Sequence, residues 1–567
     1  MDAELLLKFM GTQRFVEIVA VIVLFFPTIK FLIIVKNFIF KNGKNVNSMS
    51  NNWDNPASKE NPVRTCYFDG HKWSTKKDLI NFSNTSIKSA KKAQLKPLHV
   101  ADFRIFDKAA EDIRIPKFIR NHQEKTKIFL DTFEFTRSAY VIGGAGTGKT
   151  EWLLNIVKQQ VFTLEIFYSK KGDFETLFFR NGCDILLNPK LKDGYTHDFL
   201  AEELEYIEIF LKSLLNAVLG KGQEDYFKSS AFQRIMQFAQ KVKMQEHDNP
   251  SITTKKRYQL FIELFQDAVL KAKTGTQKSE NDVMSTVTTV FNKALLLISY
   301  RMINGGERFV VKDFIRLDNQ KQRLFLSATD TSLEALLAAS FAVLVKYQLA
   351  QTSFLSAPSN FLIAYYLDEF LSLAKVAEDE VISEMSRVGR QFRIAVIKLF
   401  QRFPKFDSDD YKEIVSNCQF MVFFPVTEPG SLEEINKQVG NIIFNEIKYV
   451  KNKDNVHKTE DRREQAIVTQ KMITSLQKEN YSHIFFSPKL GILTKAYTPR
   501  ADIKVKEYVK AILTDYIDSN KFYKFAIETI NINVEDKQNA KKSLTLDLSD
   551  LIGIGSKKPT PTQEKRS

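Results

Sequence analysis

A glycine-rich octapeptide, GGAGTGKT, carries the clearest chemistry in the sequence. It fits the pattern G-x-x-x-x-G-K-[ST], in which a loop between a strand and a helix wraps a phosphate with its backbone N–H groups. Glycines permit the tight turn, and the positive end of the following helix points at the same phosphate. We expect Lys149 to reach the terminal phosphates of a nucleotide and Thr150 to ligate Mg²⁺; the alternative is a glycine turn with a solvated lysine. The residues expected to bind the nucleotide are Gly143, Gly144, Ala145, Gly146, Thr147, Gly148, Lys149 and Thr150.

An acid pair ends a second apolar run, FLIAYYLDEF. Seven mostly apolar residues at 361–367 predict a strand buried on both faces, and Asp368 and Glu369 follow it. A carboxylate at the C-terminal edge of a parallel sheet faces the ligand crevice. We therefore expect Asp368 to hold Mg²⁺ through water and Glu369 to polarise an attacking water. The alternative is an acid pair that caps the next helix.

Strands and helices alternate around both motifs. The octapeptide lies between a predicted strand at 139–142 and a predicted helix at 151–160. Further strands are predicted at 129–133, 163–169, 185–189, 323–328, 361–369, 393–400 and 420–426. This alternation is typical of an α/β fold with a parallel sheet.

A long helical segment interrupts the alternation. From Asp198 to Ile303 apolar residues recur at intervals of three and four, and no buried strand run appears for about a hundred residues. We interpret this segment as an all-helical insertion in the α/β domain. The predicted boundaries are 126–197 and 320–500 for the nucleotide-binding domain, 198–319 for the all-α domain, and 501–567 for a C-terminal helix and polar tail.

The apolar run at 15–35, FVEIVAVIVLFFPTIKFLIIV, predicts an N-terminal membrane anchor at 1–40. It reaches the roughly 20 residues that cross a bilayer, although Glu17 and Lys30 interrupt it. Twelve Lys or Arg and four Asp or Glu follow at 36–96. Lys36, Lys41 and Lys44, directly after the run, place the following chain in the cytoplasm by the positive-inside rule, although Lys8 and Arg14 on the other side oppose this orientation. The alternatives are a buried core helix and an amphipathic hairpin.

Composition excludes several other classes of protein. The 567 residues include 82 Lys or Arg and 67 Asp or Glu, and the net charge of +15 favours an anionic partner, either nucleic acid or an anionic membrane face. Three distant cysteines exclude a disulfide framework, and seven histidines without an HExxH motif argue against a catalytic metal held mainly by histidine. Residues 41–125 are interpreted as a basic juxtamembrane region and linker.

Several segments between about Tyr140 and Pro499 together point to one family. They are YSKKGDF, ILLNP, EDYFKSSAFQRI, RLFLSATDTSLEALLAA, LDEFLSLA, MSRVGRQFRIAVIKLFQRFPKF, SNCQFMVFFPVTEPGSLEEINKQVG and RREQAIVTQKMITSLQ. In this order they resemble the TraD-type coupling ATPases of type IV secretion and conjugation, membrane-tethered relatives of hexameric RecA-like DNA pumps. The resemblance implies a RecA-like parallel-sheet P-loop ATPase domain with an inserted all-α domain and an N-terminal transmembrane helix.

The resemblance also implies cofactors, partners and a location. ATP and Mg²⁺ are the expected cofactors, and a homo-oligomer, a hexamer in the family, is the expected active form. The expected substrate is DNA or a relaxase–DNA complex, which passes to the components of a type IV secretion channel. The expected location is the bacterial inner membrane, with the ATPase domain in the cytoplasm.

Two more site residues follow from the resemblance. An arginine after glycine acts on the neighbouring subunit's nucleotide in the family, and here Arg390 matches it, with Arg387 as a competitor one turn away. A glutamine at a strand end senses the γ-phosphate in the family, and here it is Gln401. Three features depart from the family pattern: Ser169 stands where an acid is common, Arg402 stands where a small residue is usual, and only one apolar run is long enough to span a membrane.

Three functions remain open at this point. The first is a membrane-anchored ATPase that drives DNA through a secretion or conjugation channel. The second is a coupling ATPase that moves protein effectors without DNA. The third is an adaptor that recruits substrates without hydrolysis, against which the intact Lys149, Thr150, Asp368 and Glu369 argue.

Overall fold

The computed structural model describes most of the chain between Val63 and Ile530. The described residues are 63–71, 73–74, 76–103, 126–170, 172–220, 226–274, 277–315, 321–328, 331–351, 361–368, 370, 373, 381, 384–385, 387, 389, 391–403, 418–452, 455–476 and 481–530. The predicted anchor at 15–35 lies outside them.

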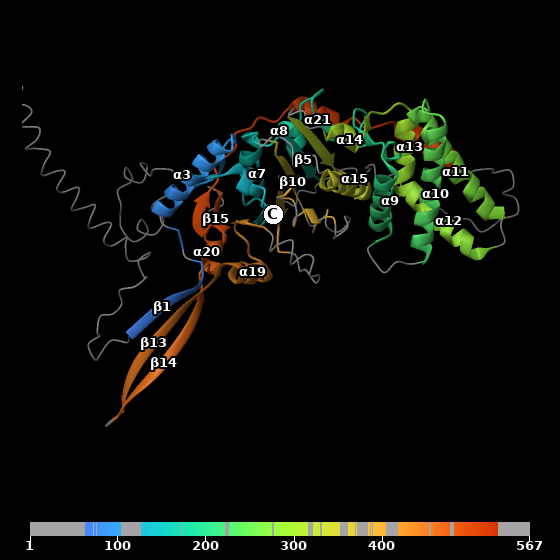
Figure 1. Cartoon of the computed structure of the whole chain (residues 1–567). Helices are drawn as coiled ribbons and strands as arrows, with labels where there is room; N and C mark the ends of the chain where they lie inside the picture. Colours follow the sequence, from blue (N-terminus) through green and yellow to red (C-terminus); the bar gives the residue numbers. More distant parts are fainter. Residues whose placement is uncertain are drawn as a thin grey trace, which may run out of the picture.

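A mixed sheet of eleven strands forms the centre of the described residues (Figure 1). Its parallel part runs in the order β12 (Phe420–Phe423), β4 (Ala139–Ile142), β11 (Ile394–Phe400), β10 (Ile363–Leu367), β5 (Leu164–Ser169), β9 (Gln322–Ser327) and β6 (Ile185–Leu187). An antiparallel part continues beyond β12 with β15 (Ser482–Ser487), β16 (Ile492–Tyr497), β2 (Leu98–Phe103) and β3 (Thr126–Leu130). Helices cover both faces of the parallel part, which explains why its strands read as continuous apolar runs.

Most of the predicted strands are confirmed, and one was misplaced. The prediction at 129–133 is wrong, because β3 ends at Leu130. Residues Thr132–Phe135 instead form the short helix α6. The Asp131 carboxylate accepts a hydrogen bond from the Phe133 N–H at 3.0 Å and so caps this helix. The segment at 129–133 therefore changes from strand to helix at Asp131.

Two hydrophobic layers lie on the two faces of the sheet. On one face pack α7 (Lys149–Lys158), α8 (Asp173–Phe178) and α3 (Lys76–Lys92), whose buried residues join one core with the facing residues of the strands. On the other face packs α15 (Thr331–Ala350), which continues into the core of the helical segment. Helix α7, which follows the glycine-rich octapeptide, and the helical segment therefore lie on opposite faces of the sheet.

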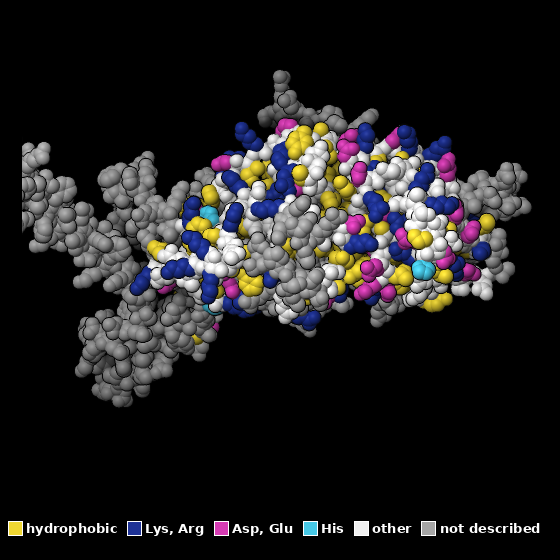
Figure 2. Space-filling view, turned by 45° about the horizontal axis from the view of Figure 1, so that its top comes forward, with side chains coloured by type: hydrophobic (Ala, Val, Ile, Leu, Met, Phe, Trp, Pro, Cys, Tyr) yellow, Lys and Arg dark blue, Asp and Glu magenta, His cyan; other side chains and the backbone are white. Residues whose placement is uncertain are grey.

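The region expected to be a linker contributes structure instead. Within 41–125 the structure places β1 (Val63–Gly70), α3 and β2. The aperiodic appearance of this region has a physical reason, because β2 pairs with β16 from the far end of the chain and α3 buries only a narrow face. Lys and Arg side chains gather on the surface at this end of the molecule, and Asp and Glu are sparse there (Figure 2).

The helical segment is a separate layer of long helices. It comprises α9 (Leu204–Leu219), α10 (Tyr226–Asp248), α11 (Thr254–Thr274), α12 (Lys278–Val290), a π-helical turn at Phe291–Leu295 and α13 (Leu296–Ile303). Two stretches of the described chain, Lys278–Ile303 and Leu333–Ala350, have the length and hydropathy of membrane spans. In each of them 67% of the apolar window is buried inside the protein, which is what core helices show.

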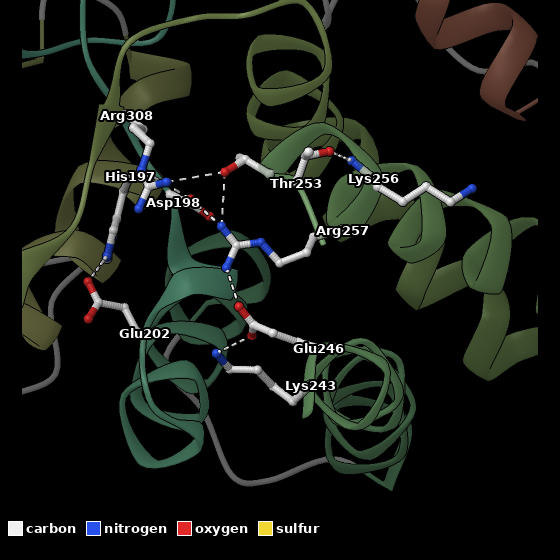
Figure 3. A network of polar contacts seen from close by, with 10 residues as sticks. His197, Asp198, Glu202, Lys243, Glu246, Thr253, Lys256, Arg257 and Arg308 are labelled. Atoms are coloured by element: carbon white, nitrogen blue, oxygen red, sulfur yellow. Dashed lines mark hydrogen bonds and ion pairs between the residues drawn. The ribbon is translucent and has the colours of Figure 1, made fainter. Parts of the chain in front are cut away.

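A buried ion-pair network joins the helical segment to the sheet domain (Figure 3). The chain enters the segment through β7 (Thr196–His197) and leaves it through β8 (Arg308–Phe309), and these two strands pair with each other. Arg257, which is 5% exposed, contacts Asp198 at 3.2 Å and Glu246 at 2.9 Å. Removal of Asp198 would leave the buried Arg257 charge with one partner fewer, and we therefore expect it to destabilise this junction.

A three-stranded antiparallel arm projects from the body (Figure 1). β13 (Gly440–Asn452) lies in its centre and pairs with β1 on one side and β14 (Asn455–Ala466) on the other. The arm follows α19 (Pro429–Val439) and returns to the sheet through α20 (Gln470–Thr474). The arm thus joins the first described residues of the chain to a late segment.

One acidic side chain, Glu175 on α8, is fully buried in the core. Burial raises its pKa from 4.5 to about 7. The folded protein therefore holds this proton more tightly than the unfolded chain does. The free energy of unfolding contributed by this group is fully present below about pH 4.5 and is lost as the pH rises through about 7.

We therefore predict that Glu175→Gln raises the free energy of unfolding above pH 7 by up to about 3 kcal/mol. The gain should vanish at acidic pH, because the native carboxyl is then protonated and resembles the amide. Melting temperatures of the full chain measured across this pH range would show it. Asp173→Asn, on the exposed side of the same helix, is the matched control and should change little. Equal pH profiles for native chain and Glu175→Gln would contradict the prediction.

Candidate active site

The glycine-rich octapeptide forms a loop between β4 and α7. Gly146 and Gly148 have positive φ values of 69° and 108°, which L side chains rarely adopt. Ala145 and Gly146 are exposed at the tip, whereas Thr147 and Gly148 are buried. The first N–H groups of α7 have no acceptor within the helix, so the loop presents donors toward an anion.

The Lys149 side chain lies over this loop. Its Nζ donates hydrogen bonds to the carbonyl oxygens of Gly143 at 2.7 Å and Gly144 at 2.8 Å. The Thr147 hydroxyl donates to the same Gly144 carbonyl at 2.8 Å. The Lys149 side chain is therefore held half-buried at the mouth of the loop, where its ammonium can meet a phosphate.

Neighbouring strands fix the start of the loop. The Gly143 N–H donates to the Phe400 carbonyl at 3.2 Å, and the Gly144 N–H donates to the Pro425 carbonyl at 2.9 Å. A Cβ on Gly143 would come within 2.5 Å of the Phe424 Cβ. The loop thus needs glycine here because β12 approaches its backbone closely.

Tyr481 covers the other end of the loop. A Cβ on Gly148 would lie 2.5 Å from the Tyr481 Cδ1, and the backbone there is left-handed as well. Behind this tyrosine lies His483, whose ring centroid is 4.8 Å from that of Phe424. Burial lowers the pKa of His483 to about 4, so this ring is neutral at physiological pH.

Asp368 and Gln401 lie at the same edge of the sheet as the loop. Gln401 follows β11, whose last residue Phe400 pairs with Ile142 directly before the loop. Asp368 follows β10 on the other side of β11, and its N–H donates to the Tyr168 carbonyl at 3.1 Å. The Asp368 side chain is half-buried and Gln401 is exposed. The structure thus brings together the loop, one predicted acid and the predicted glutamine, on three adjacent strands.

The other two predicted residues are not placed. Glu369 and Arg390 lie outside the described residues. Arg387, the competitor of Arg390, is described and exposed. Gly389 is buried, and a Cβ there would come within 2.5 Å of the Met385 carbonyl oxygen. The backbone before β11 is therefore tightly packed next to the position of Arg390.

A buried lysine near the site was not predicted. Lys398 on β11 is fully buried, and its Nζ lies 3.6 Å from the Cys418 Sγ and 5.7 Å from the centre of the Phe370 ring. Burial lowers the pKa of Lys398. The available signal was the lysine inside the otherwise apolar run IAVIKLF, which sequence analysis treated only as part of a strand.

Ser169 replaces the acid that is common in the family. It is fully buried at the end of β5, and its hydroxyl accepts a hydrogen bond from the Gly172 N–H at 3.1 Å. The next residue, Lys170, forms an ion pair with Glu334 of α15 at 2.6 Å. Ser169 therefore closes the turn before α8 without adding a charge.

Comparison with known proteins gives a family and a fold. Residues 126–489 match the family described as the type IV secretion-system coupling protein DNA-binding domain. The bacterial conjugative coupling protein TrwBdeltaN70, in an unbound form, is 15% identical with a TM-score of 0.50, over 72% of this chain and 95% of that chain. The plasmid coupling protein TrwB in complex with ADP and Mg²⁺ is 15% identical with a TM-score of 0.51, over 73% and 97%. No curated protein sequence matches the chain.

At this identity the structural likeness shows the fold alone. It confirms the predicted α/β class with a large, mostly parallel sheet. The family match covers both parts of the sheet domain and the helical segment between them.

Proposed function

The chain belongs to the type IV secretion-system coupling protein family, and from this premise we propose that it is a membrane-anchored ATPase that drives DNA to a secretion or conjugation channel. One observation carries the proposal. A complete P-loop, Asp368 and Gln401 lie at the carboxyl ends of β4, β10 and β11, on one edge of the sheet. Ligands of open parallel sheets bind at this edge.

The described residues fit ATP and Mg²⁺. ATP supplies the phosphoryl group, and Mg²⁺ offsets the charge on its oxygens. Gly146 and Gly148 give the loop the left-handed turns that aim its N–H groups outward. The Lys149 ammonium, which the Gly143 and Gly144 carbonyls hold over the loop, would meet the β- and γ-phosphates. Thr150 and Asp368 would hold the metal, and Glu369 would orient and polarise the attacking water.

The proposed active form is a ring of identical subunits, a hexamer in the family. Gln401 would sense the γ-phosphate from the strand next to the loop. Arg390 would reach the nucleotide of the neighbouring subunit, with Arg387 as the competing residue. The exposure of Arg387 supports a position at the surface for side chains on this side of the segment.

The proposed location is the bacterial inner membrane. Residues 15–35 would cross the bilayer once, and the ATPase domain would lie in the cytoplasm. The channel components would then meet the protein at the membrane.

DNA, or a relaxase–DNA complex, is the proposed substrate. The family is defined by a DNA-binding domain, and the net charge of +15 favours a polyanion. We predict that single- or double-stranded DNA raises the ATPase rate of the purified full chain several-fold, and that added salt removes this increase because phosphate contacts are screened. Phosphate release with and without DNA measures it. A rate that neither form of DNA changes would favour protein effectors as the substrate.

A further inference from the structure

A stripe of lysines lies along the outer face of α3. Leu79, Ser83, Ser86 and Ala90 are buried against the sheet, and the residues on the opposite side of the helix are exposed. With 3.6 residues per turn, the outward face falls on positions spaced by three, four and seven. This lysine stripe comprises Lys77, Asn81, Asn84, Lys88, Lys91 and Lys92, all of them exposed.

The stripe contains no acid. Asp78 lies beside it in the first turn, and from Leu79 to Ala101 the sequence contains neither Asp nor Glu. Among the described residues, none of the four lysines forms an ion pair. A charged helix face normally carries both signs, since i,i+4 pairs of opposite charge stabilise the helix and like charges destabilise it. The stripe therefore costs the isolated helix stability.

The surface around the stripe is basic as well. Exposed Lys96 follows α3, and exposed Lys127 lies on β3, whose backbone carbonyl accepts a hydrogen bond from the Ser83 hydroxyl of α3 at 3.3 Å. Figure 2 shows Lys and Arg side chains over this end of the molecule. The patch is broad and faces solvent along the whole helix.

We propose that the lysine stripe rests on the anionic lipid headgroups of the membrane in which the chain is anchored. A cluster of four to eight basic residues on the cytoplasmic side of a membrane helix is attracted to anionic lipid, with a gain of about fivefold in association for each lysine. The stripe supplies four lysines on one face, and Lys96 extends them. This inference assumes the membrane anchor proposed above.

The length of the chain supports this partner. The apolar run ends at Val35, and Lys77 follows 42 positions later; between them 36–62, 72 and 75 lie outside the described residues. A tether of this length keeps α3 close to the bilayer, so that a weak attraction acts at an effective concentration on the order of millimolar. An untethered protein would need a much stronger site to stay on the same surface.

Nucleic acid is the competing partner, and the composition of the stripe argues against it. All its cations are lysines, which act as hydrated point charges, whereas arginine gives the planar paired contacts common at phosphates of nucleic acid. The stripe also carries no aromatic side chain on which a base could stack. Lipid headgroups require neither feature.

Lysine acetylation of the full chain tests the proposal. The chain is reconstituted in nanodiscs of phosphatidylcholine, and in nanodiscs of phosphatidylcholine with phosphatidylglycerol as the minority lipid. We expect the acetylation rates of Lys88, Lys91 and Lys92 to be at least about threefold lower in the anionic discs than in the neutral discs. This protection should disappear with added salt. Lys255 and Lys256, exposed on α11, are the internal controls and should react equally in both discs.

Substitutions sharpen the test. The triple variant Lys88→Gln, Lys91→Gln and Lys92→Gln should leave Lys77 and Lys96 unprotected in anionic discs. The matched triple variant Lys241→Gln, Lys255→Gln and Lys256→Gln, on exposed positions of α10 and α11, should keep the protection.

Three outcomes would overturn the proposal. One is equal acetylation of the stripe in neutral and anionic discs. Another is protection that only duplex DNA confers, which would assign the stripe to nucleic acid. If alkaline carbonate releases the chain from membranes, the proposed anchor is contradicted, and the stripe is then tested by mixing the released chain with phosphatidylglycerol vesicles. The third outcome is that these vesicles leave the lysines of the stripe unprotected from acetylation.

Discussion

A chain carrying Lys149→Ala should lose ATP hydrolysis, by a factor of at least about 10²–10³. The substitution removes the ammonium that the Gly143 and Gly144 carbonyls hold over the loop, so no charge from this helix meets the β- and γ-phosphates. The fold should survive, because the Lys149 ammonium bonds carbonyl groups of its own loop and is not part of a hydrophobic core. Steady-state phosphate release measures the loss. Lys158→Ala, at the exposed C-terminal end of the same helix, is the matched control and should keep turnover.

Glu369→Gln separates binding from hydrolysis in the same assay. The amide keeps the size of the side chain and cannot polarise water as a carboxylate does, so ATP binding should persist while turnover is lost. Hydrolysis at the native rate would contradict the role assigned to Glu369. A native chain that binds ATP and never hydrolyses it would instead favour the adaptor function.

Arg390→Ala should also bind ATP normally and hydrolyse it slowly. An arginine supplied across a subunit boundary accelerates phosphoryl transfer by about 10³–10⁵ in switch GTPases, and a ring translocase should gain less. The ATPase rate per subunit of the native chain should then rise with protein concentration, as subunits assemble. A rate per subunit that does not depend on assembly would contradict a site shared between neighbours.

Mixing two inactive chains tests the direction of this contact. An Arg390→Ala subunit keeps a sound P-loop, and a Lys149→Ala neighbour lends it an intact arginine, so mixed rings should regain part of the activity. Arg387→Ala mixed with Lys149→Ala is the control. If mixed oligomers form and only the Arg387→Ala mixture recovers, the exposed Arg387 is the finger. If neither recovers, the arginine acts within its own subunit.

The parts of the site that sequence predicted are those with local causes. The octapeptide specifies its own loop, because its eight residues contain both the glycines of the loop and the start of α7. Asp368 was predictable because it ends a buried strand and parallel strands bring their carboxyl ends to one edge, whereas Gln401 was predicted from the resemblance alone. The resemblance to the coupling ATPases then implied that these segments belong to one RecA-like parallel sheet.

The parts that sequence analysis missed depend on distant partners. The arm of β1, β13 and β14 joins residues nearly 400 positions apart, and no local pattern specifies such pairing. Glu175 stands in the first turn of a short helix, where an acid usually faces solvent and the helix dipole, and only the packing of α8 on the sheet buries it. The burial of Lys398 was missed for the same reason, because only the assembled sheet buries a strand on both faces.

The late pairing of early strands has a consequence for synthesis. Asp102 of β2 pairs with Tyr497 of β16, which leaves the ribosome 395 residues afterwards. At synthesis rates of about 5–20 residues per second this delay is roughly 20 to 80 seconds. During it, the β2–β3 hairpin has an unpaired edge, a form of surface that invites aggregation. If the N-terminus is already inserted, the nascent chain stays at the membrane during this delay, separated from other copies. A chain made without the proposed anchor would instead expose the same edge in free solution.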